Sequence, residues 1–203
     1  MIAIIDFEIG NLTAIANMLH RIGIRSVITA DPDVVAVADR LILPGNGAFD
    51  ACMRNLRSTG LTPLLEKRVL QDRIPLLGIC VGAQMLGVRS EEGKEPGLGW
   101  LDFEVIRFTE CPGFPVPHMG WNEVTQMTTN PLIGLLPEDS RFYFVHSYFL
   151  SPSSPSDVIL RATYGIEFAA AVGRGNIAGV QFHPEKSHRF GKALLSNFAQ
   201  GTI

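Results

Sequence analysis

Apolar and polar residues come in alternating blocks along the first half of the chain. Short apolar runs at 1–6, 27–29, 40–43 and 74–79 are typical of buried strands. After the first run, apolar residues recur at helical spacing, namely Leu12, Ile15, Ala16, Leu19 and Ile22. Strands that alternate with helices favour parallel pairing with right-handed crossovers. We therefore predict a doubly wound α/β layer for this half, with a further helix at 62–71 that is capped by Thr62.

Strand-like patterns dominate the second half of the chain. These strands are expected at 101–108, 141–150, 158–164 and 168–181. Residues 173–176 predict a hairpin turn, and the serine- and proline-rich residues 151–156 predict a surface loop. A closing amphipathic helix carries Phe190, Leu194, Leu195 and Phe198. The predicted fold is a mostly parallel α/β sheet with an antiparallel extension in the second half, in a single domain over residues 1–203.

Composition limits the classes of partner and environment. The chain has 203 residues, 46% of them hydrophobic, and a formal net charge of −3. This length fits one domain with a sizeable core, and this charge gives no reason to expect nucleic acid or a membrane as partner. No apolar run has transmembrane length, and three cysteines argue against a disulfide framework. We expect a cytoplasmic protein without signal peptide, metal site or cofactor.

One cysteine lies between two glycines, in the segment Gly-Ile-Cys-Val-Gly at 78–82. The segment follows a predicted strand, and a helix is expected to begin at Gln84. This pattern matches the G-x-S-x-G nucleophile elbow with Cys in place of Ser. A helix N-terminus favours the thiolate form, and the Val81 N–H can face a developing oxyanion. Cys80 is therefore the candidate nucleophile, whereas the other two cysteines lack such flanks and are interpreted as structural: Cys52 and Cys111.

A second segment, Gln-Phe-His-Pro-Glu-Lys-Ser at 181–187, offers a base. Pro184 disfavours the helical region for His183, so the chain is expected to be extended there. Side chains at i and i+2 of an extended chain point the same way, which places Glu185 beside His183. The carboxylate can then orient the imidazole that takes the proton from Cys80. Together the two segments predict a Cys-His-Glu triad for acyl transfer.

These motifs resemble those of the class I, triad-type glutamine amidotransferases, and the matching segments run through nearly the whole chain. Within that class, two segments are similar to the glutaminase subunits of imidazole glycerol phosphate synthases: Pro-His-Met-Gly-Trp-Asn at 117–122 and Tyr-Phe-Val-His-Ser-Tyr at 143–148. Further matching segments lie at 5–12, 43–49, 75–80 and 89–93. The resemblance implies that L-glutamine is hydrolysed to glutamate and ammonia through a thioester at Cys80.

The resemblance also implies roles for residues around the triad. Asn46 and Gly47, in the loop Pro-Gly-Asn-Gly at 44–47, would complete the oxyanion hole with Val81. The glutamine would be held by Gly47, Gln84, His146, Ser147 and Tyr148. An ordinary strand-to-helix turn is the competing interpretation of the loop, and packing on a sheet face is the competing interpretation of His146 and Tyr148.

A partner follows from the same resemblance. Ammonia would pass to a (β/α)8-barrel synthase subunit in a heterodimer, which makes imidazole glycerol phosphate and an aminoimidazole carboxamide ribotide in histidine biosynthesis. The positions that match the junction and its ammonia gate are Asn11, Trp121, Tyr143 and Lys186. A solvated helix start is the competing interpretation of Lys186.

Two positions depart from the family pattern. The family usually has valine where this chain has Asn46, and asparagine reaches left-handed conformations more readily. The resemblance implies that the peptide at position 46 reorients to complete the oxyanion hole. This active orientation of the 44–47 loop is therefore expected to be easier to reach here. Residues 7–9, Phe-Glu-Ile, replace a pattern that begins with Tyr-Gly, in a loop that faces the partner in relatives.

Two other functions stay open at this point. One is a paralogous glutaminase that supplies ammonia for amidation of a surface-polysaccharide sugar, a branch that residues 89–100 and 186–188 resemble. The other is a cysteine peptidase or a binding module of the same fold. An intact triad argues against the binding module, and the segment 117–122 argues against the peptidase.

Overall fold

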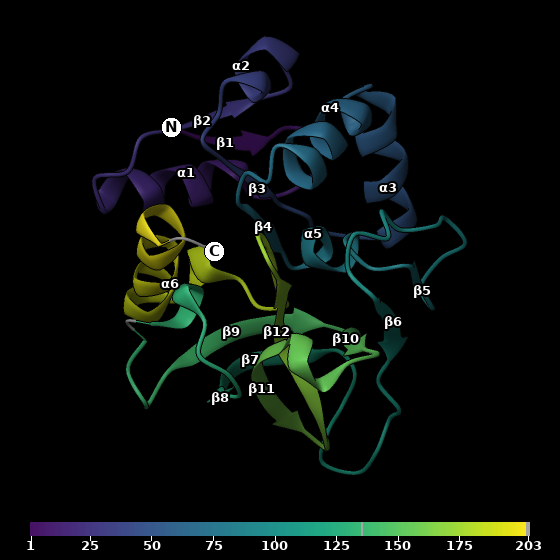
Figure 1. Cartoon of the computed structure of the whole chain (residues 1–203). Helices are drawn as coiled ribbons and strands as arrows, with labels where there is room; N and C mark the ends of the chain where they lie inside the picture. The colour runs from purple at the N-terminus through teal and green to yellow at the C-terminus, as the bar shows by residue number, and fades with distance from the viewer. Residues whose placement is uncertain (135, 202–203) are drawn as a thin grey trace.

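The computed structural model describes residues 1–134 and 136–201. A continuous sheet runs through it in the order β2-β1-β3-β4-β13-β12-β10-β6-β5 (Figure 1). Its first part is parallel, as predicted, and consists of β2 (Ser26–Thr29), β1 (Ile2–Ile5), β3 (Arg40–Leu43), β4 (Leu76–Ile79) and β13 (Ile177–Val180). Every residue of β1, β4 and β13 is buried, as expected where helices cover both faces of a parallel sheet.

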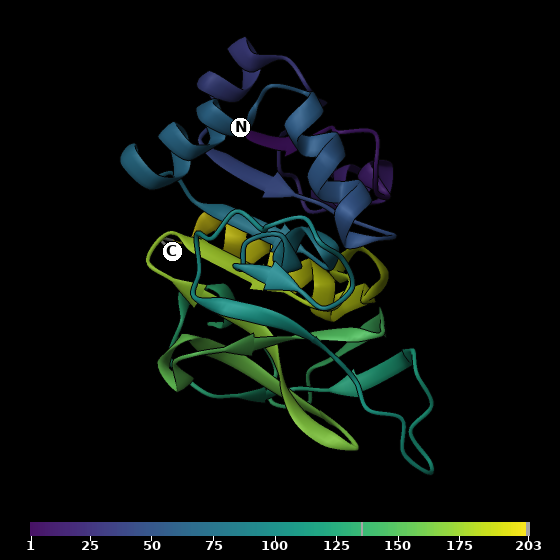
Figure 2. The same cartoon turned by 90° about the vertical axis from the view of Figure 1, so that its right-hand side faces the viewer.

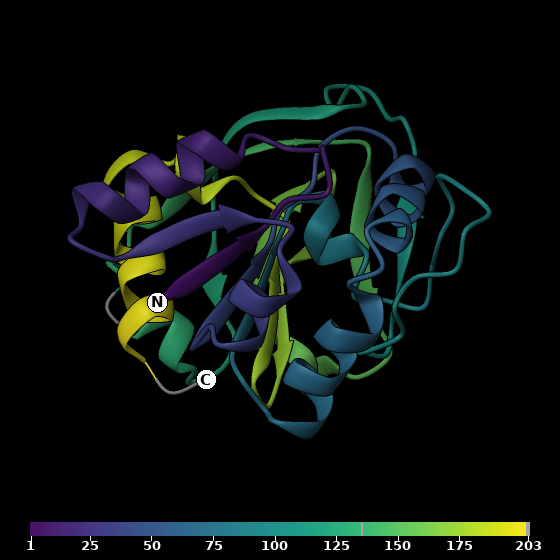
Figure 3. The same cartoon turned by 90° about the horizontal axis from the view of Figure 1, so that it is seen from above.

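Helices lie on both sides of the parallel strands (Figure 3). On one side are α1 (Leu12–Arg21) and α6 (His188–Gln200). On the other are α3 (Phe49–Ser58), α4 (Thr62–Glu66) and α5 (Val81–Gln84), with the short α2 (Pro32–Ala36) in contact with α4. The predicted stripes of α1 and α6 point inward, because Ile15, Leu19, Leu194 and Phe198 are all buried.

The sheet changes direction at β12 (Ile166–Arg174), which pairs antiparallel with β13. The turn between them includes Gly175 and Asn176, where the hairpin was predicted. The strands that extend the sheet beyond β12 are β11 (Val158–Tyr164), β10 (Tyr148–Pro152), β6 (Phe103–Arg107), β8 (Thr125–Gln126) and β5 (Arg89–Ser90), visible below the helical layers in Figure 2. The prediction of a mixed sheet with an antiparallel second half is confirmed.

The predicted strand at 141–150 is wrong as a single element. It is two strands, β9 (Arg141–His146) and β10, with Ser147 between them. β10 joins the main sheet, whereas β9 pairs antiparallel with β7 (His118–Glu123) in a separate two-stranded sheet. The sequence did not indicate β7, because three of its six residues are polar and Gly120 lies in its middle. The bend at Ser147 brings the end of β9 and the start of β10 to the edge of the cavity described below.

Two smaller predictions also need correction. The helix at 62–71 begins at Thr62 itself, so Leu61 takes the cap position, and its second half is a π-helical turn at Lys67–Gln71. The loop at 151–156 is partly structured, because β10 continues to Pro152 and a 3-10 turn occupies Pro155–Asp157.

Within the described ranges, none of the helices has the length and apolar content needed to cross a bilayer.

Candidate active site

Cys80 lies at the sharp turn where β4 ends and α5 begins. Its backbone has φ 55° and ψ −115°. A residue other than glycine rarely has a positive φ, and such strain, which costs about 1–3 kcal/mol, persists only where the surroundings enforce it. The prediction of an elbow is confirmed, but the helix begins at Val81 and ends at Gln84, so the expected start at Gln84 is wrong.

Glycines let the elbow and the loop after β3 approach each other. A Cβ at Gly82 would lie 2.0 Å from the Leu43 carbonyl oxygen, and a Cβ at Gly45 would lie 2.3 Å from the Gly82 nitrogen. No side chain fits in either place, since both neighbours are backbone atoms. This contact holds the 44–47 loop against the start of α5, and it brings Asn46 and Gly47 to the same cavity as Cys80.

His183 and Glu185 form a buried pair at the start of a 3-10 turn, Pro184–Lys186. His183 is extended as predicted, with φ −104° and ψ 96°. Its Nδ1 lies 2.7 Å from Glu185 Oε1, and both side chains are at most 5% exposed. The predicted contact is present, although Glu185 reaches the imidazole from a tight turn and not from an extended chain.

The charge state of His183 depends on its two neighbours. Burial alone would lower the pKa of His183, but Cys80 and Glu185 outweigh it and raise that pKa well above its ordinary range. Glu185 occupies Nδ1, so Nε2 is the nitrogen available to the thiol. Among the described residues Nε2 has no aligned hydrogen bond, which is common for a catalytic pair before substrate binds. The arrangement can move a proton between Cys80 and His183.

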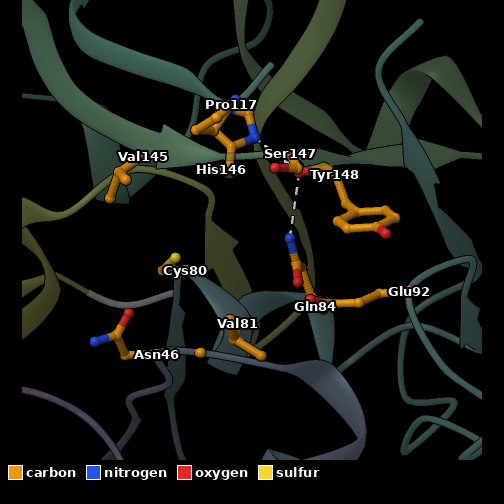
Figure 4. Close-up of a pocket in the computed structure, with 11 residues that line it drawn as sticks. Asn46, Cys80, Val81, Gln84, Glu92, Pro117, Val145, His146, Ser147 and Tyr148 are labelled. Carbon is orange, nitrogen blue, oxygen red and sulfur yellow. Dashed lines mark hydrogen bonds between the residues drawn. The ribbon is translucent and has the colours of Figure 1, made fainter.

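A cavity of about 290 Å³ lies in front of Cys80 (Figure 4). Cys80 and Val81 face it from one side, and His146, Ser147 and Tyr148 face it from the other. All residues predicted to form the oxyanion hole or to bind glutamine line it: Asn46, Gly47, Val81, Gln84, His146, Ser147 and Tyr148. Its size suits a small metabolite and not a folded substrate.

Three further residues line this cavity and were not singled out from the sequence: Glu92, Pro117 and Val145. Glu92 is the one with chemistry of its own. Its Oε2 accepts a hydrogen bond of 2.9 Å from the backbone N–H of Phe49, which fixes the carboxylate at the start of α3. It lies in the segment 89–93 used for the resemblance, but the sequence did not indicate its place in the cavity wall.

Three of the four residues predicted at the partner junction lie together. The Lys186 ammonium lies 5.7 Å from the centroid of the Tyr143 ring, and the Trp121 ring lies 6.3 Å from that of Tyr143. Trp121 also stacks on His188 with ring planes 5° apart and is 44% exposed. Asn11 instead caps α1, because its side chain accepts a hydrogen bond from Ala14 N.

Comparison with known proteins gives a consistent set of relatives. A model of the glutamine amidotransferase class-I family matches residues 3–201. The imidazole glycerol phosphate synthase subunit HisH 2 of Pseudomonas aeruginosa is 48% identical over 200 residues, covering 98% of this chain and 99% of that protein. The subunit of the same name from Methanococcus maripaludis is 48% identical over 198 residues, covering 98% of each. A crystal structure of a glutamine amidotransferase matches with a TM-score of 0.76 at 21% identity, over 97% of this chain and 96% of that one, which shows a common fold.

Proposed function

The chain belongs to the glutamine amidotransferase class-I family, and we propose that it is the glutaminase subunit of an imidazole glycerol phosphate synthase. One observation carries this proposal. A cysteine on a strained elbow opens into a cavity sized for an amino acid, and the histidine of a buried histidine–glutamate pair lies beside that cysteine. The relatives name the acceptor pathway, and the site supports the chemistry.

The reaction proceeds in two acyl-transfer steps. His183 Nε2 holds the proton taken from Cys80, and the Cys80 thiolate sulfur attacks the side-chain amide carbon of glutamine. The tetrahedral oxyanion is stabilised by the N–H of Val81 and by N–H groups of the loop at Asn46 and Gly47. Its collapse breaks the C–N bond, and His183 gives the proton to the leaving ammonia. His183 then activates a water molecule that hydrolyses the thioester to glutamate and restores the thiol.

Recognition of glutamine uses the opposite walls of the cavity. The fixed carboxylate of Glu92 suits the α-ammonium group, and polar groups of Ser147 and Tyr148 suit the α-carboxylate. Gln84 donates from Nε2 to Tyr148 O at 3.3 Å and to Gln181 Oε1 at 3.2 Å, so its amide is held in one orientation. His146 completes the wall beside Tyr148.

The catalytic groups come from both halves of the chain, so we treat residues 1–203, of which 135 and 202–203 lie outside the described ranges, as one catalytic domain. β4 leads to Cys80 and β13 leads toward His183, and the two strands are neighbours in the sheet. The free thiol of Cys80 requires a reducing compartment, which supports a cytoplasmic setting.

Ammonia becomes unreactive once protonated in water, so it has to pass directly to a synthase. We assign this role to a (β/α)8-barrel subunit that docks over Trp121, Tyr143 and Lys186, with Asn11 at the edge. The aromatic and cationic contacts among the first three support a common gate at this surface. Ammonia then reacts with the phosphoribosyl-formimino intermediate to give imidazole glycerol phosphate and an aminoimidazole carboxamide ribotide.

Reconstitution with the barrel subunit tests this function. The pair should release glutamate and imidazole glycerol phosphate in equal amounts from L-glutamine and the ribotide intermediate. Cys80→Ala should lose glutamine-dependent synthesis and keep synthesis from ammonium salts, since only the nucleophile is gone. Cleavage of casein in place of free glutamine would support the peptidase. Glutamate release without imidazole glycerol phosphate, but with amidation of a sugar by another partner, would support the paralogous branch.

A further inference from the structure

A chain of hydrogen bonds runs behind the cavity wall, and its members on β7 have no part in the mechanism above. His118 on β7 and His146 on β9 are directly opposite in the strand pairing, and His118 Nδ1 lies 2.9 Å from His146 Nε2. At one end, His146 Nδ1 lies 2.7 Å from the carbonyl oxygen of Tyr148. At the other, Asn122 Nδ2 lies 3.3 Å from His118 Nε2 and 2.9 Å from the Thr163 carbonyl oxygen.

Both rings are buried and uncharged at neutral pH. His118 is 3% exposed and His146 is 6% exposed. Burial lowers the pKa of His118 to about 4 and that of His146 to about 3. The His118 ring stacks on Tyr164, with centroids 4.0 Å apart, and on Phe144, with centroids 4.9 Å apart.

The carbonyl groups at the two ends of this series of hydrogen bonds fix which atom donates in each bond, because both rings are neutral. A carbonyl only accepts, so Tyr148 O takes the hydrogen of His146 Nδ1 and leaves Nε2 of that ring as an acceptor. His118 must then donate from Nδ1, which makes its own Nε2 an acceptor. The Thr163 carbonyl requires an amide nitrogen opposite it, so Asn122 supplies that last donor. Both histidines are held as the Nδ1–H tautomer.

This series of hydrogen bonds reaches both the glutamine pocket and the proposed junction with the partner subunit. The Tyr148 carbonyl that accepts from His146 also accepts from Gln84, so the peptide at the cavity wall is held from two sides. On β7, His118 alternates with Met119 and Trp121, which are 61% and 44% exposed on the outer face. Through its hydrogen bond to His146, His118 therefore connects β7, whose outer face is exposed, to the wall of the glutamine pocket.

We propose that His118 is a positioning residue for glutamine binding: it donates to His146 and thereby fixes the His146 ring and the Tyr148 peptide at the cavity wall. This inference rests on the proposed glutaminase function. It assigns no contact between His118 and the substrate, so its loss should affect the affinity for glutamine more than the chemical step.

Two variants of similar shape, both without the ring, isolate the effect of the hydrogen-bond donor at position 118. Asparagine at 118 keeps an N–H near the position of Nδ1, whereas leucine has the same outline without a donor, and both lose the aromatic stacking. We expect His118→Leu to have a KM for L-glutamine about tenfold above that of His118→Asn, because the leucine leaves His146 Nε2 unpaired in the interior. The kcat values should agree within about threefold. Alkylation of Cys80 by iodoacetamide should be equally fast in both, as a check on the elbow.

A second measurement tests the direction of these hydrogen bonds and does not depend on enzymatic activity. In the full wild-type protein labelled with 15N-histidine, NMR near pH 7 should show Nδ1 protonated and Nε2 unprotonated for His118 and His146. An Nε2–H tautomer at His118 would overturn the inference, and so would equal KM values in the two variants. If the wild type does not hydrolyse glutamine at all, the proposed function fails, and the tautomers still report on the chain.

Discussion

Acid should unfold this protein partly by protonating the buried pair of histidines, and the size of the effect follows from His118. Its pKa in the folded state is lowered by burial to about 4, from an ordinary value of 6.5. The unfolded chain therefore binds a proton before the folded one does. His118 contributes stability that is fully present above about pH 6.5 and is lost as the pH falls through the window from about 6.5 to about 4.

The loss inside this window is about 1.4 kcal/mol per pH unit for one group. Between pH 7 and pH 5 His118 alone should lower the free energy of unfolding by about 2 kcal/mol. His146, whose pKa burial also lowers, adds to the loss. His118→Asn removes the titrating ring, so its stability should fall less on acidification than that of the wild type, by about the same 2 kcal/mol.

The assay is urea unfolding of the wild type and His118→Asn at pH 7 and at pH 5. His20→Asn, on the exposed side of α1, is the matched control and should keep the wild-type difference between the two pH values. Ordinary carboxylates titrate in all three proteins and cancel in the comparison. The reasoning is refuted if His118→Asn loses as much stability as the wild type between pH 7 and pH 5.

Further predictions concern the catalytic groups and their support. His183→Ala should lower the kcat for glutamine hydrolysis by about 10²–10⁴-fold, and Glu185→Gln by less, because an oxygen can still accept from Nδ1; equal kcat for wild type and His183→Ala would exclude the triad. Gly82→Ala places a Cβ 2.0 Å from the Leu43 carbonyl oxygen, so we expect the free energy of unfolding, measured by heat or urea, to fall by about 1–3 kcal/mol and glutaminase activity to be lost. Wild-type stability and activity in this variant would contradict the close contact. Asn46→Val should lower the unstimulated rate of glutamate release and leave the partner-stimulated rate nearly normal; an unchanged unstimulated rate would show that Asn46 does not control the loop.

Local patterns were sufficient for much of the fold. The apolar runs of the parallel strands are uniform because those strands are buried on both faces, and β3 has the predicted bounds, Arg40–Leu43. The elbow and the histidine–glutamate contact are encoded within a few residues, by two glycines and one proline. Their short range is why the sequence could predict them.

Other features depend on contacts between distant segments. The pattern at 141–150 continues through Ser147, and only pairing with β7 and β6 shows that the chain changes sheets there. The pairing of His118 with His146 joins two strands, β7 and β9, that have β8 between them along the chain, so spacing alone could not indicate it. The position of Glu92 in the cavity wall depends on the packing of its loop against α3, seen in its hydrogen bond from Phe49 N.

The central claim is that Cys80 is the nucleophile that attacks glutamine, and covalent labelling tests it most directly. The full chain is treated with an alkylating analogue of glutamine, with and without an excess of L-glutamine, and the modified residue is located by peptide mass spectrometry. We predict a label on Cys80 that glutamine prevents. Cys52 should stay unlabelled because burial raises the pKa of its thiol to about 11, and the exposed Cys111 serves as the internal control for nonspecific alkylation. A label that lies mainly on Cys52 or Cys111, or that glutamine does not prevent, would contradict the account.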